Sequence, residues 1–390
     1  MTDSSKRKIR MGMVGGGEGA FIGAVHRMAA RLDGDIELVC GAFSGDADKS
    51  RQFGESLNLA PSRCYGSYEA MMREEAALPA SEKMDFVAVV TPNHLHFPVA
   101  KLALEQGFHV MSDKPATFSY QEALQLKKTV DDTQRLYGLT HVYTAYPMIR
   151  EAQAKVQNGE LGAIRKMVVE YSQGWLASKE AEDGKQAKWR LDPSKAGVSC
   201  CMGDIGVHAA NLVEFVSGLQ ITAICADLTS VVPGRRLDDD GTVLLQFDNG
   251  SKGVLLASQI ATGEENNLHL RIYGDKASIE WRQMSPNTLI LRDLHGHAQH
   301  IRSGVGALHP QTHSAMRLPA GHPEGYLEAF GNLYAAFAHA IHEYNSTDKA
   351  ARQFVPGINE ALRGMAFIEQ VVEASNQHVK WCELKQGRTV

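Results

Sequence analysis

The sequence predicts an α/β protein with two domains. A doubly wound Rossmann domain comes first, followed by an α+β domain with an open, mostly antiparallel sheet. Three observations support this prediction. Strand-like and helix-like runs alternate in the first 145 residues, glycines follow the first strand, and consecutive alternating strands replace this pattern from about residue 150. We therefore place the domains at residues 1–145 and 146–390, with the terminal helices free to pack back on the first domain.

The first half contains a series of apolar, strand-like runs separated by helix-like runs. The strands are predicted at residues 8–17, 36–43, 85–92, 108–111 and 136–146. The run at 85–92 is almost continuously apolar, which is typical of a parallel strand buried on both faces. Helices are predicted at residues 21–32, 46–58, 96–107 and 119–134. The last of these begins at Ser119 as N-cap, with Glu122 in a capping-box pattern.

The second half changes to alternating runs joined by Asn-Gly or Gly-Asp turns, which predicts antiparallel strands. After a helix at 148–159, these runs occupy residues 163–176, 218–232, 241–260, 266–283 and 287–294, and two amphipathic helices follow at 324–344 and 357–377. The run at 241–260 alternates poorly and leaves apolar residues on both faces. Because exposed apolar area usually marks an interface, we expect a symmetric homo-oligomer, a dimer or tetramer, formed through this sheet.

Composition narrows the class of protein. The formal net charge is −5, so no basic footprint for nucleic acid is present. There is no signal-peptide pattern and no apolar run of about 18 residues, so we expect no membrane partner. Six cysteines without a C-x-x-C pair predict reduced thiols in the cytoplasm. The histidine-rich residues 294–313 are expected to be an exposed turn and loop, with no metal, because no cysteine or carboxylate stands with them at ligand spacing.

A glycine cluster follows the first strand, at Gly15, Gly16, Gly17, Gly19 and Gly23. Glycines at a strand-to-helix turn let the backbone approach a pyrophosphate, which rests on the helix N-terminus. Gly15 and Gly17 fit the dinucleotide fingerprint, but Ala20 stands where its third glycine belongs. Gly23 is the other choice and implies three extra residues in the loop. We predict phosphate binding here rather than a plain flexible turn.

The end of the second strand is where a Rossmann protein usually selects its nucleotide, through an acid that binds the ribose of NAD. Ser44 occupies this place, and Lys49 and Arg51 lie downstream. A missing carboxylate removes repulsion toward a 2′-phosphate, so the sequence favours NADP slightly without excluding NAD. Asp46 is the alternative ribose acid if the loop is one turn longer.

Two further places carry candidate acid–base groups. Lys114 lies between Asp113 and Pro115 just past a strand. The alternative to a catalytic role is a structural one, in which Lys114 is only a charge at the start of a helix. Asp204 and His208 are four residues apart, so on a helix both project from one face, where the carboxylate can orient the imidazole. The alternative is a helix-dipole Asp beside a core His.

Three motifs occur in a recognisable order: T-P-N-H-L-H through D-K-P at 91–115, W-R-L-D-P at 189–193, and G-D-I-G-V-H at 203–208. Together they resemble the Gfo/Idh/MocA family, which includes glucose–fructose oxidoreductase and inositol dehydrogenase. The resemblance extends over nearly the whole chain, including residues 322–337. It implies a Rossmann domain followed by a domain whose open sheet often supports oligomers. It also implies hydride transfer between NAD(P) and a carbinol carbon of a sugar, cyclitol or related polyol.

The resemblance also implies roles for individual residues. Lys114 matches the family's catalytic lysine, and Asp204 and His208 match the acid and histidine of its substrate site. The expected cofactor contacts are Gly15, Gly17, Phe21, Ile22, Ser44, Thr91, Pro92, Asn93, His96, Asp113, Trp189 and Arg190. Tyr146 and Arg190 complete the expected substrate contacts.

The sequence departs from the family pattern at three places. Asp113 replaces the usual glutamate with a shorter carboxylate. The stretch G-V-S-C-C-M-G-D at 197–204 lacks the usual glycine run, so its loop is bulkier. The glycine loop is longer, so we expect the pyrophosphate contact to shift toward the backbone amides of Phe21 and Ile22.

The expected chemistry uses Lys114 and His208. A strand end delivers Lys114 to the carboxyl edge of the sheet, and Pro115 restricts its backbone to extended geometry. Its ammonium is expected to bond the substrate hydroxyl and lower its pKa, while His208 takes the proton as general base. Two alternatives stand beside this dehydrogenase: a nucleotide-binding sensor without turnover, and a lyase or hydrolase that uses retained NAD for transient oxidation.

Overall fold

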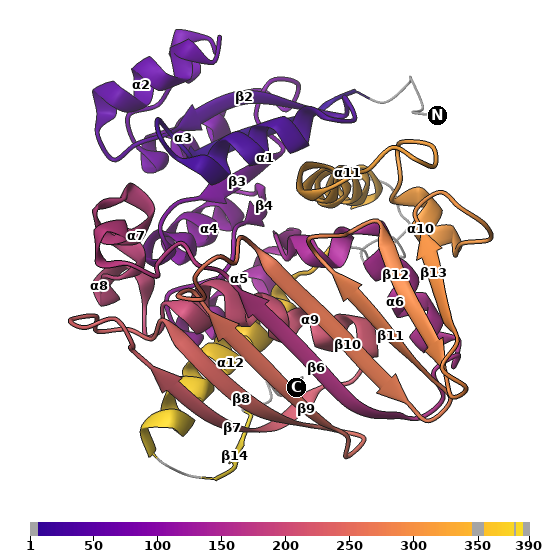
Figure 1. Ribbon diagram of the computed structural model, residues 1–390. Coiled ribbons are helices and arrows are strands. Elements are labelled where there is room, and N and C mark those ends of the chain that lie inside the picture. The colour runs from indigo at the N-terminus through magenta and orange to yellow at the C-terminus, as the bar shows by residue number, and fades with distance from the viewer. Residues whose placement is uncertain (1–6, 345–354, 378–379, 385–390) are drawn as a thin grey trace. The chain divides into compact units, whose positions relative to one another are not determined.

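The computed structural model describes residues 7–344, 355–377 and 380–384 (Figure 1). The chain divides into two compact units. Unit 1 comprises Met1–Thr140 and Phe330–Leu362, and unit 2 comprises His141–Ala329 and Arg363–Val390.

Unit 1 is built on a five-stranded parallel sheet with the order β2-β1-β3-β4-β5, which confirms the predicted Rossmann domain. Its strands are β1 (Ile9–Gly15), β2 (Ile36–Ala42), β3 (Phe86–Val90), β4 (His109–Ser112) and β5 (Tyr137–Leu139). All five residues of β3 are buried, as expected for a central parallel strand. The connecting helices are α1 (Phe21–Arg31), α2 (Ala47–Ser56), α3 (Tyr68–Ala77), α4 (His96–Glu105) and α5 (Tyr120–Thr133).

The predicted capping box of α5 is present in unit 1. The Ser119 hydroxyl accepts a hydrogen bond from the backbone N–H of Glu122 at 3.2 Å. The Glu122 carboxylate in turn accepts one from the backbone N–H of Phe118 at 2.9 Å, one residue before the N-cap. Two backbone donors at the helix start are therefore satisfied by side chains.

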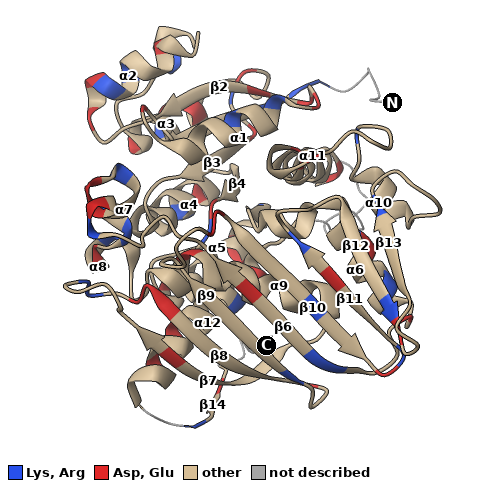
Figure 2. Ribbon diagram, in the orientation of Figure 1, with Lys and Arg blue, Asp and Glu red and all other residues tan. Residues whose placement is uncertain are grey.

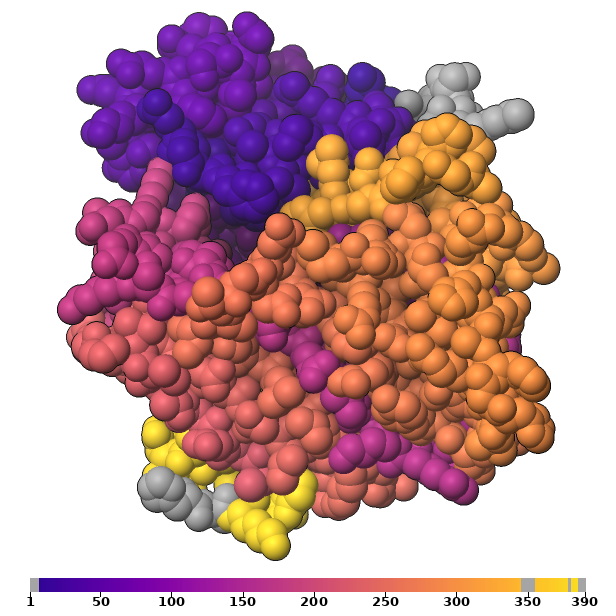
Figure 3. Space-filling model, in the orientation of Figure 1, coloured from indigo at the N-terminus to yellow at the C-terminus, as the bar shows by residue number. Residues whose placement is uncertain are grey.

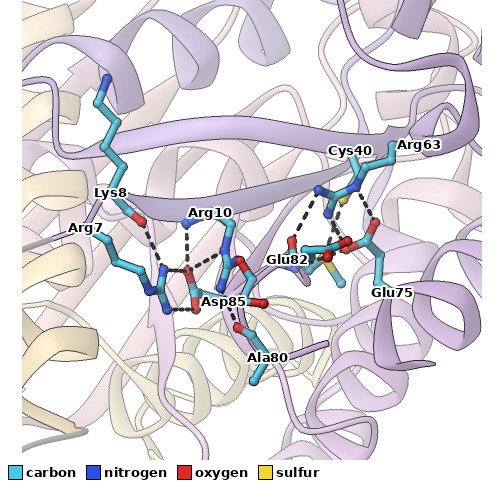
Figure 4. Close-up of polar contacts among 11 residues, drawn as sticks. Arg7, Lys8, Arg10, Cys40, Arg63, Glu75, Ala80, Glu82 and Asp85 are labelled. Atoms are coloured by element: carbon cyan, nitrogen blue, oxygen red, sulfur yellow. Dashed lines mark hydrogen bonds and ion pairs between the residues drawn. The ribbon is translucent and has the colours of Figure 1, made fainter. Parts of the chain in front are cut away.

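Two charged clusters anchor the sheet of unit 1, and Figure 4 shows both. The carboxylate of Asp85, just before β3, accepts hydrogen bonds from Nη1 and Nη2 of Arg7, each at 2.7 Å. Its Oδ2 also lies 3.6 Å from Nε of Arg10. Glu75 of α3 is fully buried and pairs with Arg63. Such a buried pair is costly to break because one charge would remain without its partner. The Glu75 pair therefore ties α3 to the short 3-10 turn that contains Arg63.

Unit 2 contains a nine-stranded sheet with the order β13-β12-β11-β10-β6-β9-β8-β7-β14. All neighbours are antiparallel except β6 and β9, which confirms the mostly antiparallel sheet. The strands are β6 (Ile164–Ser172), β7 (Ile221–Thr229), β8 (Asp240–Phe247), β9 (Lys252–Ser258), β10 (Asn267–Gly274), β11 (Ala277–Arg282), β12 (Thr288–Asp293), β13 (Ala298–Arg302) and β14 (Cys382–Glu383). Its helices are α6 (Pro147–Gln157), α7 (Lys185–Arg190), α8 (Pro193–Ala196), α9 (Val207–Ser217) and α10 (Pro310–Ser314).

The sequence interpretation needs two corrections in unit 2. The histidine-rich region, expected to be turn and loop, contains β13 and α10, because β13 pairs with β12 along its whole length. The strands β8 and β9, expected to alternate poorly, alternate regularly between buried and more exposed positions. One face of this sheet is therefore the core face, covered by α6 and α9, and the other is the outer face seen in Figures 1 and 3.

The two long helices α11 (Tyr326–Tyr344) and α12 (Ile358–Gln377) are shared between the units. Within unit 1, Phe337 of α11 packs on Phe86 with ring centroids 5.3 Å apart. Within unit 2, Arg363 of α12 donates from Nε to the Glu214 carboxylate at 2.9 Å. Each unit thus incorporates late helical segments in its own core.

All six cysteines lie among the described residues, and none of them is paired in a disulfide. Among the described residues, no helix is long and apolar enough to cross a membrane. Within the same residues, no group of three or more His, Cys, Asp or Glu side chains could hold a metal ion. His297 instead pairs with Asp293 at 2.9 Å, and His309 caps α10.

Candidate functional site

The glycine turn between β1 and α1 is packed too closely for larger residues. Gly15 and Gly16 have φ angles of +83° and +68°, which favour glycine. A Cβ on Gly23 would lie 2.4 Å from the Cα of Gly16, and one on Gly17 would lie 2.5 Å from the carbonyl oxygen of Phe43. Gly23 thus serves the close helix-to-strand packing that the third fingerprint glycine provides, and the longer loop accommodates Ala20.

The N-terminus of α1 suits an anion. The helix begins at Phe21 after Ala20, whose methyl group cannot cap the free backbone N–H groups, and its first turn has no acidic residue. Arg27 donates to the carbonyl oxygen of Gly16 at 2.8 Å and so supports the turn from within the helix. These features fit a dinucleotide pyrophosphate, held by the turn and by backbone amides of Phe21 and Ile22.

The loop after β2 contains Ser44 and Asp46, the two residues considered for nucleotide selection. The Ser44 hydroxyl accepts from the backbone N–H of Asp46 at 3.1 Å. Asp46 is the N-cap of α2, where its Oδ1 accepts from the backbone N–H groups of Asp48 and Lys49, each at 3.1 Å. These hydrogen bonds lower the pKa of Asp46. The cap uses one carboxylate oxygen of Asp46, so only part of the carboxylate is available to a nucleotide.

The loop after β3 is joined to the loop after β4 by His96. Its Nδ1 lies 2.6 Å from the carbonyl oxygen of Pro115, and its Nε2 lies 2.8 Å from that of Thr91. His96 is almost fully buried at the start of α4, and burial lowers its pKa while nearby Asp113 opposes this shift. Asn93 is also buried in the short turn before α4. His96 therefore holds two predicted cofactor segments at a fixed separation.

Asp113 and Lys114 follow β4 at the carboxyl edge of the sheet. Asp113 Oδ1 accepts from the backbone N–H of Lys114 at 2.9 Å and from the hydroxyl of Thr140 at 2.8 Å. The peptide bond between Lys114 and Pro115 is cis. Asp113, the shorter acid at the position of the family's glutamate, therefore holds the backbone of Lys114.

In unit 1, the predicted residues gather at one edge of the sheet. The glycine turn, Thr91 to His96, and Asp113 to Lys114 follow β1, β3 and β4, which are neighbouring parallel strands. The carboxyl ends of parallel strands form the ligand-binding edge of such sheets. The order β2-β1-β3 puts the topological switch point beside the glycine turn, where a dinucleotide is expected.

Asp204 of unit 2 lies in a π-helical turn, Met202–Gly206, directly before α9. The backbone N–H of Val207 donates to the carbonyl of Met202, five residues back. The assumption of a regular α-helix through Asp204 and His208 is therefore wrong, because the turn that contains Asp204 is π-helical. Single π turns inside helices occur frequently at functional sites.

The Asp204 carboxylate is held by two side chains. Its Oδ2 lies 3.2 Å from Nε of Arg190 and accepts from Nε2 of Gln259 at 2.9 Å. The Arg190 guanidinium lies over the ring of Trp189, 4.2 Å from its centroid, and 5.9 Å from that of Trp175. Arg190 and Asp204 therefore form an oriented ion pair beside an aromatic surface.

His208 lies in α9 among aromatic rings. Tyr143 meets it edge-on with centroids 4.9 Å apart, and His141 does so at 5.5 Å. The hydroxyl groups of Tyr143 and Tyr171 are hydrogen-bonded to each other at 2.5 Å. The Tyr171 hydroxyl also donates to Oδ1 of Asn266, and Nδ2 of Asn266 donates to the Tyr143 hydroxyl. Burial raises the pKa of Tyr143 and of Tyr171, so both phenols stay neutral. His208 is 7 % exposed, so these rings fix its orientation.

Tyr146 occupies a position in the core. It is 1 % exposed, with its ring 5.4 Å from that of Trp281 and stacked parallel to Tyr143 at 6.1 Å. These surroundings give no support to the predicted substrate contact. The sequence interpretation in turn missed Tyr143, Tyr171, Gln259 and Asn266, whose partners are distant in sequence and follow no motif.

A parallel Rossmann sheet with a glycine turn and a clustered carboxyl edge is typical of a nucleotide-binding domain. Comparisons with known proteins agree. Residues 9–141 match the model of the oxidoreductase family NAD-binding Rossmann fold, and residues 149–280 match that of the GFO/IDH/MocA C-terminal domain. The chain is 33 % identical over 385 residues to the oxidoreductase YfiI of Bacillus subtilis, covering 97 % of this chain and 98 % of YfiI.

Solved structures give the same result. An inositol dehydrogenase homolog from Azotobacter vinelandii, complexed with NAD+, superposes with a TM-score of 0.94 at 34 % identity, covering 98 % of this chain and 100 % of that one. The homolog complexed with NADH and myo-inositol superposes with a TM-score of 0.91 at 33 % identity, covering 97 % and 98 %. The chain belongs to the Gfo/Idh/MocA family of oxidoreductases, an assignment that confirms the resemblance carried by its motifs.

Proposed function

We propose that this protein is an NAD(P)-dependent dehydrogenase that acts on a carbinol or keto carbon of a cyclitol, sugar or related polyol. The family assignment supports the reaction class. The relative complexed with NADH and myo-inositol supports a small polyhydroxylated substrate. The observation that carries the proposal is Lys114 at the carboxyl end of β4, with its backbone held by Asp113 and its neighbour Pro115 held by His96.

In the proposed reaction, Lys114 bonds the reacting hydroxyl of the substrate and stabilises the developing alkoxide. His208 takes the hydroxyl proton, and its ring is oriented for this role by Tyr143 and His141. Asp204 and Arg190 hold neighbouring substrate hydroxyls, since a carboxylate accepts and a guanidinium donates hydrogen bonds. The nicotinamide, when bound, supplies the acceptor of the hydride that leaves the substrate carbon.

The cofactor would be held by the glycine turn, the N-terminus of α1 and the loops after β3 and β4. The closely packed glycines and the absence of a side-chain cap at Ala20 are the features of the described residues that fit it. Trp189 and Arg190 are proposed to line the nicotinamide end, as the family resemblance implies. We further propose that the protein is a homo-oligomer.

A screen of inositols, sugars and keto-sugars, followed by nicotinamide absorbance with both NAD and NADP, tests the proposal. We expect stoichiometric reduction or oxidation of the nicotinamide with at least one compound. Turnover of substrate without net absorbance change would favour a lyase or hydrolase with transient oxidation. Nucleotide binding without any turnover would favour the sensor.

A further inference from the structure

Gln259 follows β9 and is completely buried, yet neither motif nor family resemblance assigns it a role. Its side chain lies between Cys200 and Asp204. The Cys200 thiol is 3.3 Å from Oε1 of Gln259, and Nε2 of Gln259 donates to Oδ2 of Asp204 at 2.9 Å. The backbone of Gln259 is fixed as well, because its N–H donates to Asp239 and its carbonyl accepts from Leu176.

The chemistry of the three groups permits one arrangement. Burial raises the pKa of Cys200, and the nearby Asp204 and Asp238 carboxylates raise it further, so the sulfur keeps its proton. The acceptor-only carboxylate of Asp204 takes the amide NH2, and the thiol then donates to the amide oxygen on the other side. The reverse orientation would set an amide oxygen against a carboxylate oxygen, which is repulsive. The Cys200 thiol thus stabilises the orientation of the Gln259 amide that binds Asp204.

The same cysteine also holds the main chain of Asp204. The backbone N–H of Asp204 donates to the carbonyl of Cys200 at 2.9 Å, and the backbone N–H of Cys200 donates to Asp238 at 3.0 Å. The cysteine stands in the stretch where the family's glycine run is replaced. The substitution therefore supplies a thiol donor at a place where glycine offers no side chain.

We propose that Gln259, oriented by the Cys200 thiol, is a positioning residue that fixes the Asp204 carboxylate. With Arg190 on the same oxygen, the carboxylate is held by two side chains. This proposal rests on the proposed role of Asp204 in substrate binding.

The first experiment compares Gln259→Leu with Gln246→Leu, a matched substitution on β8 whose partner is the exposed Lys252. We expect Gln259→Leu to lower kcat/KM about tenfold or more, as for loss of a hydrogen bond to a charged group, with the Kd for NAD within about twofold of wild type. Gln246→Leu should leave both unchanged.

Gln259→Glu gives a readout that a merely structural role would not move. A protonated carboxyl at this position donates to Asp204 as the amide does, whereas an ionised one repels it. We therefore expect the activity of Gln259→Glu relative to wild type to rise as pH falls, while that of Gln259→Leu stays flat. If Gln259→Leu does not fold, this pH dependence carries the test, and a ratio that is independent of pH overturns the proposal.

A second readout needs no substrate. The S–H stretching band of Cys200, isolated as the difference between wild type and Cys200→Ala, is expected at the lower wavenumber of a hydrogen-bonded thiol. It should move to higher wavenumber in Gln259→Leu, and an unchanged band would overturn the proposed contact.

Asp204→Asn distinguishes a failure of the positioning role of Gln259 from a failure of the proposed function. If Asp204→Asn loses activity but Gln259→Leu stays within about twofold of wild type, the positioning role is wrong and the proposed function stands. If Asp204→Asn itself retains activity, the proposed role of Asp204 in the reaction fails, whatever the infrared band shows.

Discussion

The imidazole of His96 bridges two backbone carbonyls, with Nδ1 2.6 Å from Pro115 O and Nε2 2.8 Å from Thr91 O. One buried ring thus links the loop after β3 to the loop that carries Lys114. This contact gives the histidine of the T-P-N-H-L-H motif a physical role beyond lining a cofactor.

Replacing His96 by Leu should therefore loosen the Lys114 loop. We expect the variant to lower kcat about tenfold or more and to reduce the free energy of unfolding by about 1–3 kcal/mol, because the buried ring loses the hydrogen bond that its N–H donates to a backbone carbonyl. Steady-state kinetics and urea unfolding measure both effects. His297→Leu, at a histidine whose side chain is 80 % exposed, is the control and should change neither. Normal kcat in a folded His96→Leu protein would show that the bridge does not position Lys114.

Cofactor choice is predicted from the loop after β2. Ser44 offers no negative charge there, so we expect measurable binding of NADP as well as NAD, and Ser44→Asp should weaken NADP selectively by repelling its 2′-phosphate. Fluorescence titration with both nucleotides measures this. NAD binding with no detectable NADP binding would refute the prediction and would favour Asp46 as the ribose acid.

The stability of the protein should depend on His26, which is fully buried in α1. Its Nδ1 lies 2.7 Å from the hydroxyl of Tyr334, and burial lowers its pKa from 6.5 to about 4. The unfolded chain therefore binds the proton more readily, so stability falls as pH drops from about 7 to about 4 and is unaffected by this group above that range. The full effect is about 3 kcal/mol.

Urea unfolding of wild type and His26→Gln at several pH values measures this contribution. Glutamine keeps a polar partner for Tyr334 but does not titrate. We expect the wild-type protein to lose more stability on acidification than the variant, and equal losses would contradict the assignment.

The outer face of the unit 2 sheet is where the predicted oligomer would form. Leu244 and Tyr273 are 43 % and 38 % exposed, and Figure 2 shows charged residues on the neighbouring strands of this face. There His269 lies between Glu170 and Glu280, at 3.2 and 3.1 Å. We expect a dimer or tetramer by light scattering at micromolar concentration and dissociation on Leu244→Lys. A monomeric wild-type protein would contradict the prediction.

Much of the fold could be predicted from local patterns. The five parallel strands and the Ser119 cap were accessible because each depends on neighbouring residues. The helix α3 was not predicted, since it buries the charged Glu75 together with Met71 and Met72 and so lacks a clean apolar stripe. The strand β13 was not predicted either, because four of its five residues are exposed and its strand conformation depends on pairing with β12.

The candidate site divides in the same way. Lys114, Asp204 and His208 stand in contiguous motifs, so they could be proposed from the sequence. The π turn at Asp204 was missed because its spacing also fits an ordinary helix. Gln259 was missed because it meets Asp204 across 55 positions of the chain, where only the folded sheet brings them together.

The proposed reaction depends most directly on Lys114. We expect Lys114→Ala to lower kcat about 10²- to 10⁴-fold, the usual size of acid–base assistance, while the Kd for NAD changes only a few-fold, because the glycine turn and α1 hold the nucleotide. Lys101→Ala, on the exposed side of α4, is the matched control and should behave as wild type. Near-normal turnover of Lys114→Ala on a verified substrate would contradict the central assignment, and the D-K-P segment would then be only a turn between strand and helix.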